Sequence, residues 1–201
     1  MSSETKDAKP LVIGKNSKKI GQAPALALIN PKFPRNVGTA VRLASCYGLS
    51  QVWFTGNRFS LDPSAGQRLP REERMKGYRD VDLIQNDYFF EQFDKDVVPV
   101  AIEVRENAEH LLTFEHPEKA LYVFGPEDGS ISRTYLQHCH RFVIIPTRHC
   151  LNLATAIATV LYDRMHKNSL QGKQDIITRG ICESLRDELG LGPDVLGIDE
   201  E

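Results

Sequence analysis

Four polar side chains in three separate segments could act together on a hydroxyl or phosphate group. Asn36 and Arg42 occupy the first segment, Glu127 the second and Asn152 the third. Carboxamides and guanidinium groups bind oxygen atoms, and carboxylates accept hydrogen bonds from N–H groups. Each segment follows a predicted strand. Because open α/β sheets bind ligands at the carboxyl ends of their strands, we expect one site there.

The stretch from residue 141 to 166 shows how such side chains are positioned. Residues 142–145 form an uncharged apolar run that stops at Pro146, and a turn over residues 147–150 follows. Apolar residues then recur at helical spacing from Ala154 to Met165, which predicts a strand, a turn and a buried helix. A second apolar face on this helix predicts packing on the sheet and also on another helix, including one from a second subunit.

The remaining elements alternate between strands and helices. Apolar runs predict strands over residues 25–29, 51–55, 97–104 and 121–124. A helix is expected from Val37 to Gly48, after a segment in which Pro31 and Pro34 should prevent helix. A short helix is expected over residues 87–93. This order predicts an α/β fold with a mostly parallel sheet flanked by helices.

The ends of the chain differ in composition from its middle. Residues 1–22 contain five lysines and few apolar side chains, so we expect a flexible tail. One compact domain is expected over residues 23–167. Residues 168–201 form a C-terminal extension with one predicted helix over 179–189. Residues 57–80 are polar and irregular.

Composition excludes several classes of protein. No apolar run approaches the roughly 20 residues of a membrane helix, and the N-terminus lacks the apolar region of a signal peptide, so we expect a cytoplasmic protein that does not contact membranes. The formal net charge of −2 argues against nonspecific coating of nucleic acid, so any RNA contact needs a local basic patch. Four cysteines without a CxxC pair are interpreted as reduced thiols.

Metal ligand types occur in two groups, residues 138–140 and 149–150. They flank the predicted strand over 142–145, and its length separates them by about 17 Å. One tetrahedral zinc ion cannot bridge that distance, so no metal site is expected.

The three polar segments resemble the SPOUT superfamily, specifically the SpoU/TrmH family of RNA ribose 2′-O-methyltransferases. The resemblance covers residues 24–167, and all three family motifs occur in the family's order. The matching residues are Asn36, Gly38 and Arg42 in the first motif, Gly125, Glu127 and (with a shift of one residue) Gly129 in the second, and Ile145, Pro146, Leu151 and Asn152 in the third.

This resemblance implies a deep C-terminal trefoil knot and S-adenosyl-L-methionine as the cofactor. A Rossmann-type methyltransferase would instead show a glycine-rich turn after its first strand, which residues 30–38 lack. Cys150 stands where the family usually has serine, and the turn after Pro146 is shorter than usual. The residues expected to line the cofactor pocket are Ile102, Gly125, Ile145, Pro146, Cys150 and Leu153.

The implied reaction is methyl transfer to a ribose 2′-hydroxyl of tRNA or rRNA. A guanidinium has a pKa above roughly 12, so we expect Arg42 to grip an RNA phosphate beside the cleft rather than act as a base. Asn36 and Asn152 should orient the ribose, and Glu127 should hold the turn that shapes the cofactor pocket. Structural roles remain open: either asparagine could cap a helix, Arg42 could be a solvated charge and Glu127 a turn residue.

RNA and a second copy of the chain are the expected partners. The homodimer is expected through the helix over residues 151–165, because the family builds each site across two subunits. The cationic side chains expected to bind RNA are Lys32, Arg35, Arg68, Arg71, Arg74 and Lys76. The alternative is a noncatalytic RNA-binding protein that retains the fold. A nucleotide-binding signalling domain would need a phosphate loop, and none is found.

Overall fold

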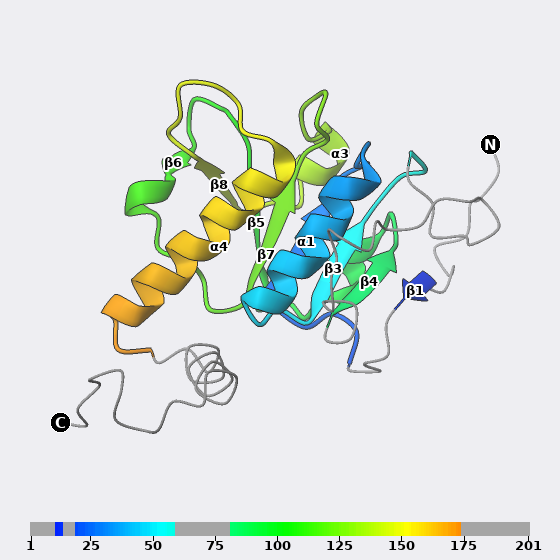
Figure 1. The fold of residues 1–201 in the computed structure, drawn as a ribbon, viewed down its shortest axis with the longest axis horizontal. Helices are drawn as coiled ribbons and strands as arrows, with labels where there is room; N and C mark the ends of the chain where they lie inside the picture. The colour runs from blue at the N-terminus through cyan, green and yellow to red at the C-terminus, as the bar shows by residue number, and fades with distance from the viewer. Residues whose placement is uncertain (1–10, 14–18, 59–80, 174–201) are drawn as a thin grey trace, which may run out of the picture. The chain divides into compact units, whose positions relative to one another are not determined.

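The computed structural model describes residues 11–13, 19–58 and 81–173 (Figure 1). These residues form an eight-stranded sheet in the order β1-β4-β3-β2-β7-β5-β8-β6. The strands are β1 Leu11–Ile13, β2 Ala25–Leu28, β3 Gln51–Phe54, β4 Asp82–Gln85, β5 Val98–Ile102, β6 Glu109–His110, β7 Ala120–Phe124 and β8 Arg141–Ile144. The helices are α1 Pro34–Cys46, η3 Phe89–Gln92, η4 Leu111–Thr113, α3 Arg133–Leu136 and α4 Leu153–Leu170.

The sheet is parallel except at one edge, where β1 pairs antiparallel with β4. This confirms the predicted mostly parallel α/β architecture. The chain divides into two units, residues 1–163 and 164–201, and α4 crosses their boundary. The sheet and the site described below belong to the first unit. Among the described residues, no helix combines the length and apolar character needed to cross a membrane.

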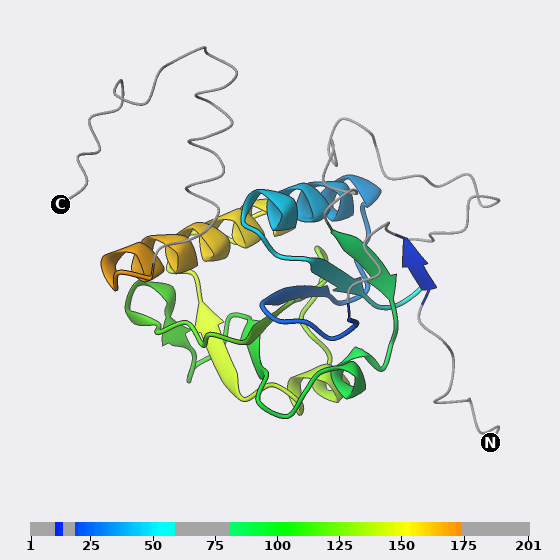
Figure 2. The ribbon, with the colours of Figure 1, turned by 90° about the horizontal axis from the view of Figure 1, so that it is seen from below.

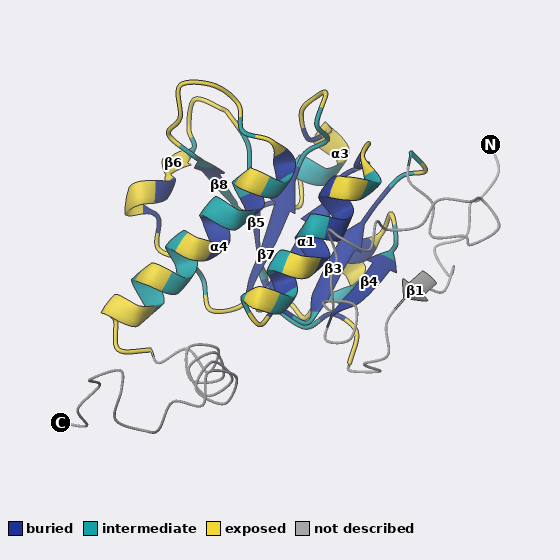
Figure 3. Cartoon of the chain, viewed as in Figure 1, coloured by how far each residue is buried: buried dark blue, intermediate teal, exposed yellow. Residues whose placement is uncertain are grey.

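Helices cover both faces of the sheet. In Figure 2, α1 and the first part of α4 lie on one face, and η3 and α3 lie on the other. Strand side chains are buried against both layers, which gives one apolar cluster on each face (Figure 3). Trp53 and Tyr122 are the largest fully buried side chains. Loops from both faces of the sheet meet at its carboxyl edge, between the two helix layers.

Helix α1 begins earlier than the prolines suggested. It starts at Pro34 rather than Val37, with Phe33 at the N-cap position. Proline is well tolerated in the first helical turn, because its missing N–H would have no intrahelical acceptor there. The expectation that Pro34 lies outside the helix is therefore wrong, and Asn36 becomes a residue of the helix itself.

The sequence patterns did not predict three short strands, β1, β4 and β6. Asp82 and Gln85 end β4 with polar residues, and β6 has only two residues, so neither shows a clear apolar run. Strand β1 lies inside the expected N-terminal tail. The backbone N–H groups of Gly21 and Gln22 also donate to Oε1 of Gln51, at 3.0 and 3.1 Å. The tail boundary predicted at residue 22 therefore differs from the structure, since part of this segment joins the sheet.

A buried polar network fastens α4 to the sheet. Nδ1 of His116 lies 2.6 Å from the hydroxyl of Tyr122, and its Nε2 lies 2.8 Å from Oδ2 of Asp163. The imidazole is 1% exposed and Tyr122 is fully buried. Because a carboxylate oxygen accepts, Nε2 carries the hydrogen, and in the neutral imidazole Nδ1 then accepts from the tyrosine hydroxyl.

Tyr122→Phe should therefore lower the free energy of unfolding. The substitution leaves the buried Nδ1 of His116 without its donor, which costs about 1–3 kcal/mol. Urea unfolding followed by circular dichroism measures the change. Tyr162→Phe is the matched control, because Tyr162 is 58% exposed. Equal stability of the two variants would contradict this role.

Candidate active site

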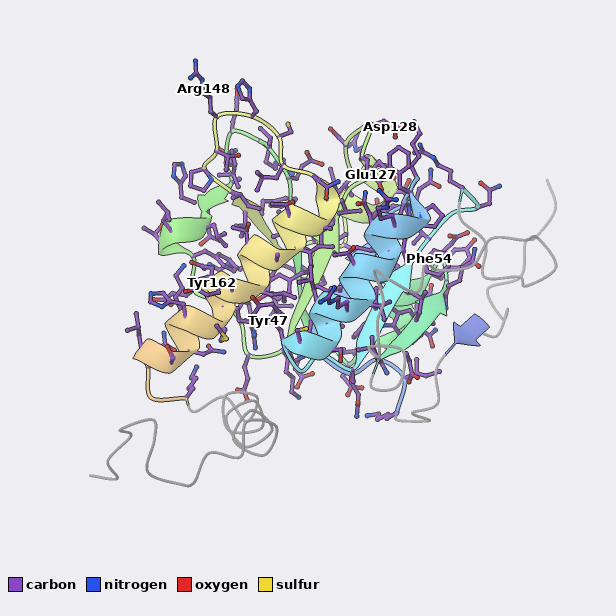
Figure 4. The ribbon with its side chains drawn as sticks, viewed as in Figure 1. Tyr47, Phe54, Glu127, Asp128, Arg148 and Tyr162 are labelled. Carbon is purple, nitrogen blue, oxygen red and sulfur yellow. The ribbon has the colours of Figure 1, made fainter. Side chains whose placement is uncertain are left out.

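Glu127 holds the beginning of α1 from the loop that follows β7. Its two carboxylate oxygens accept hydrogen bonds from the backbone N–H of Lys32 at 2.8 Å, from that of Phe33 at 3.3 Å and from Nδ2 of Asn36 at 2.7 Å. Figure 4 shows Glu127 beside the first turn of this helix. A negative charge is favourable at a helix N-terminus. Glu127 therefore fixes the turn before α1, and its expected role in holding the turn that shapes the cofactor pocket stays a prediction.

Asn36 extends this network to the third motif. Its Oδ1 accepts from Nδ2 of Asn152 at 3.2 Å, while its own Nδ2 donates to Glu127. Asn36 is 6% exposed. Three segments that are far apart in the sequence thus meet in one line of hydrogen bonds, Asn152 to Asn36 to Glu127, at the carboxyl edge of the sheet.

The geometry decides between the structural and functional readings of the two asparagines. Asn36 lies inside α1 and makes no N-cap hydrogen bond, so the capping reading is wrong for it. Asn152 does cap α4, because its Oδ1 accepts from the backbone N–H of Ala154 at 2.9 Å and of Thr155 at 3.4 Å. Its Nδ2 remains free for Asn36, so Asn152 caps the helix and joins the network at once.

A second carboxylate stands next to Glu127. Asp128 accepts from both terminal nitrogens of Arg58, at 2.8 and 2.7 Å, and from Nζ of Lys32 at 3.2 Å. Arg58 first, and then Lys32, hold the pKa of Asp128 well below its usual range. Sequence reasoning missed Arg58 and Asp128 as neighbours of the site. The only signal for Asp128 was its position directly after Glu127.

Arg42 does not contact this network within one chain. It is exposed on α1, whereas Val41 is 1% exposed and faces the core. Six residues separate Arg42 from Asn36, which corresponds to about 9 Å along the helix axis. Within one chain Arg42 therefore lies apart from this network, and its expected place beside the cleft stays a prediction.

The predicted cofactor residues gather around three neighbouring strand ends. Ile102 ends β5 and pairs with Phe124 of β7 and Val143 of β8. Ile102 and Ile145 are partly buried against the cluster that contains Leu153, which is 7% exposed. The other residues assigned to this pocket are Gly125, which is partly buried, and Pro146 and Cys150, which are exposed.

The loop after β7 approaches its neighbours closely at Gly125. A Cβ there would lie 3.2 Å from Cγ1 of Ile131 and 3.4 Å from its backbone nitrogen. Oε2 of Glu103 accepts from that same nitrogen at 2.8 Å, which ties the loop to the end of β5. Apolar side chains beside tightly held backbone fit the adenosyl part of S-adenosylmethionine, which needs an apolar slot and main-chain partners.

The predicted RNA-binding residues fall into two groups. Lys32 already pairs with Asp128, and its ammonium lies 5.4 Å from the ring centre of Phe33. Arg35 is exposed on the first turn of α1. Arg68, Arg71, Arg74 and Lys76 lie outside the described residues and remain sequence-based predictions.

Metal ligands do not gather in the part of the chain that is described. No group of three or more histidine, cysteine, aspartate or glutamate side chains there could hold a metal ion. Burial raises the pKa of the Cys139 thiol to about 12, so this residue stays protonated near neutral pH.

The parallel sheet and the polar network define an α/β protein whose candidate site lies at the carboxyl edge of the sheet. The sequence profile of the SpoU rRNA Methylase family matches residues 23–162, and the chain belongs to this family. The family predicted from the three motifs is thereby confirmed.

Individual relatives are similar to this chain in sequence or in fold. The chain is 24% identical to the tRNA (cytidine-2′-O-)-methyltransferase TrmJ of Methanocaldococcus jannaschii, over 69% of this chain and 66%, just under two thirds, of that protein. A structure described as giving insights into 2′-OH methylation of C/U34 on tRNA superposes with a TM-score of 0.62 at 24% identity, covering 74% of this chain and 96% of the other. The methyltransferase AviRb of Streptomyces viridochromogenes, solved with AdoMet, gives a TM-score of 0.59 at 19% identity, covering 72% of this chain and 57% of the other.

Proposed function

We propose that this chain is an S-adenosyl-L-methionine-dependent RNA methyltransferase that modifies a ribose 2′-hydroxyl of tRNA or rRNA. The observation that carries the proposal is the line of hydrogen bonds from Asn152 through Asn36 to Glu127. It joins the three motifs beside the residues that fit the cofactor. Family membership and a relative named as a tRNA 2′-O-methyltransferase support the same activity.

The network can orient a ribose. Each carboxamide nitrogen carries two hydrogens, and the network uses one on Asn152, so a second N–H can donate to a ribose oxygen. Both oxygens of Glu127 already accept from protein N–H groups. Glu127 is therefore a positioning residue, and the 2′-hydroxyl proton passes to an RNA phosphate or to water. Asn36 is hydrogen-bonded to both residues, so the position of Glu127 also determines that of Asn152.

S-adenosylmethionine would be held by Ile102, Gly125, Ile145 and Leu153, with the exposed loop of Pro146 and Cys150 closing over it. When bound, it supplies an electrophilic methyl group on a sulfonium. The protein must then align the ribose oxygen with that group, since in-line geometry supplies much of the rate. A fold neighbour solved with AdoMet supports this cofactor.

The position of Arg42 favours a site shared between two chains. Arg42 is exposed on the helix layer that α1 forms with α4, and Tyr162 of α4 is 58% exposed on the same layer. Figure 4 places Tyr162 and Tyr47 on these two neighbouring helices. A second copy docked on this layer would cover the tyrosines and bring Arg42 to its partner's network, where the guanidinium grips an RNA phosphate.

The protein is therefore expected to sediment as a homodimer at micromolar concentration. Tyr162→Glu should weaken the dimer, because it places a charge in an apolar interface. Leu112→Glu is the matched control, since Leu112 is 71% exposed and belongs to η4 rather than to α1 or α4. A parent that sediments as a monomer of 22.7 kDa would remove both the dimer and the shared site.

The deep knot is also part of the proposal. Strand β8 lies between β5 and β6, so residues 103–108, which join those two strands, bridge across β8. The chain continues past this bridge into α4. That arrangement, together with family membership, supports a threaded C-terminal segment.

Calorimetric titration with S-adenosylmethionine, followed by methyl transfer to total tRNA and rRNA, tests the proposed function. We expect one cofactor site per chain and methylated ribose in the nuclease digest. RNA binding without cofactor binding would favour the noncatalytic alternative, in which Cys150 and the short turn after Pro146 no longer serve the cofactor.

A further inference from the structure

A cavity of about 700 Å³ opens where β2, β3 and β4 end, on the face of the sheet that carries η3 and α3. Its volume lies within the range of small-ligand sites. None of the residues assigned above to the ribose or the cofactor lines it. The cavity is therefore separate from the methyl-transfer site, and the proposed function leaves it without a role.

One wall of the cavity is aromatic. Phe90 stacks on His138 with ring centres 4.8 Å apart, and Phe89 behind it lies 4.2 Å from Phe90 and 6.0 Å from Tyr135. Tyr88, also in the lining, is 44% exposed. Because these rings hold one another in place, they offer preformed faces on which a flat ring can stack.

Other residues of the lining present hydrogen-bond acceptors. Asn30 lines the cavity, and its side-chain oxygen is buried without a hydrogen-bond partner among the described residues. Its backbone is in the left-handed region, with φ 46°, and its N–H donates to Oγ1 of Thr55 at 3.0 Å. Gly56 permits this packing, because a Cβ there would lie 2.3 Å from the same oxygen. A buried unpaired acceptor is costly, so turning the Asn30 side chain toward the cavity to meet a ligand N–H would be favourable.

The charges in the lining select the kind of ligand. Asp87 and Glu91 line the cavity, and Oδ1 of Asp87 accepts from the backbone N–H of Gly56 at 2.7 Å. Carboxylates repel phosphate but accept hydrogen bonds from amines. Aromatic rings and acceptors in one lining suit a nucleobase that carries an exocyclic amine, and RNA-binding proteins stack unpaired bases on such rings.

Two turns connect the cavity with the methyl-transfer site. Pro126 lines the cavity, and the next residue, Glu127, holds Asn36. Asn30 likewise lies two residues before Lys32, whose N–H donates to Glu127. We propose that the cavity binds an unstacked, amine-bearing base of the same RNA whose ribose is methylated. This inference rests on the proposed function and names how the substrate is recognised.

Binding of the RNA pentamers A5, C5 and U5 to the full-length protein tests the proposal, because uracil lacks an exocyclic amine. The parent should bind A5 or C5 more tightly than U5. Asn30→Gly keeps the left-handed backbone but deletes the acceptor, so this preference should fall about tenfold. Tyr88→Ala should weaken all pentamers by about tenfold, since stacking does not distinguish bases. His140→Ala, an exposed control outside the cavity, should match the parent.

S-adenosylmethionine titrations of the same variants separate this inference from the proposed function. Unchanged cofactor affinity together with altered pentamer binding supports the inference. Equal affinity of the parent for A5, C5 and U5, or no binding of any, overturns it. Loss of cofactor binding in folded Asn30→Gly also overturns it, because the cavity would then belong to the cofactor. A parent that binds no cofactor refutes the proposed function, while the pentamer preference still decides the role of the cavity.

Discussion

Arg42→Ala is expected to lower RNA methylation by about 10²–10³-fold while affinity for S-adenosylmethionine stays unchanged. A guanidinium that grips an RNA phosphate beside the reacting ribose also favours the alkoxide that develops in the transition state, and such a group contributes about this much to turnover. Cofactor affinity should not change, because Arg42 is exposed on α1, away from the strand ends where the cofactor residues gather. Single-turnover methylation and calorimetry measure the two quantities. Weakened cofactor binding with an intact fold would contradict this placement of Arg42.

Mixing two inactive variants tests whether Arg42 acts in its partner's site. Chains carrying Arg42→Ala and chains carrying Glu127→Gln are co-expressed with different tags and purified as mixed dimers. If the site is shared, each mixed dimer contains one site with both native residues, and about half of the parent's activity returns. Mixed dimers that stay inactive would place Arg42 and Glu127 in the same chain's site.

Glu127→Gln is expected to reduce both activity and stability. The carboxylate accepts from three N–H groups, and a carboxamide would turn its own N–H toward one of them. Hydrogen bonds to a charged acceptor contribute about 1.5–3 kcal/mol each when buried, and partial exposure of Glu127 reduces the expected loss to about 1–2 kcal/mol. Misplacement of Asn36 and Asn152 should lower turnover about 10²-fold. Thermal unfolding and methylation rates measure these effects.

Asp128→Asn provides the matched control for Glu127. Asp128 is the adjacent carboxylate, but its partners Lys32 and Arg58 are side-chain cations rather than the backbone of α1. Surface ion pairs of this kind contribute little to stability. If Asp128→Asn destabilised the protein as much as Glu127→Gln, the loss would reflect general loop charge rather than the hold on α1.

Much of the fold follows from local sequence patterns. Strands β2, β3, β5, β7 and β8 each contain at least three consecutive apolar residues, and α4 shows helical spacing. Strands β1, β4 and β6 are short or end in polar residues, so only pairing with neighbours makes them strands. Pro34 was misinterpreted because proline breaks a helix interior but is well suited to its first turn.

The sequence predicted which residues meet in the candidate site, but not how they are arranged there. Motif spacing brought Asn36, Glu127 and Asn152 together correctly, although they come from three separate segments. Spacing could not reveal that Glu127 binds the start of α1, or that Arg42 lies on the exposed side of that helix. The sequence could not show that the side-chain oxygen of Asn30 is a buried acceptor, because its burial depends on contact with Gly56, which follows another strand.

The hydrogen bond between Asn152 and Asn36 sets an order of assembly. Asn152 both starts α4 and donates to Asn36, so the ribose-binding network cannot close before the last described helix has docked against α1. A nascent chain that ended before residue 152 would contain every strand of the sheet but no complete site. Under the proposed function, methyl transfer would begin only after α4 had docked, and chains that end before this helix would not modify RNA.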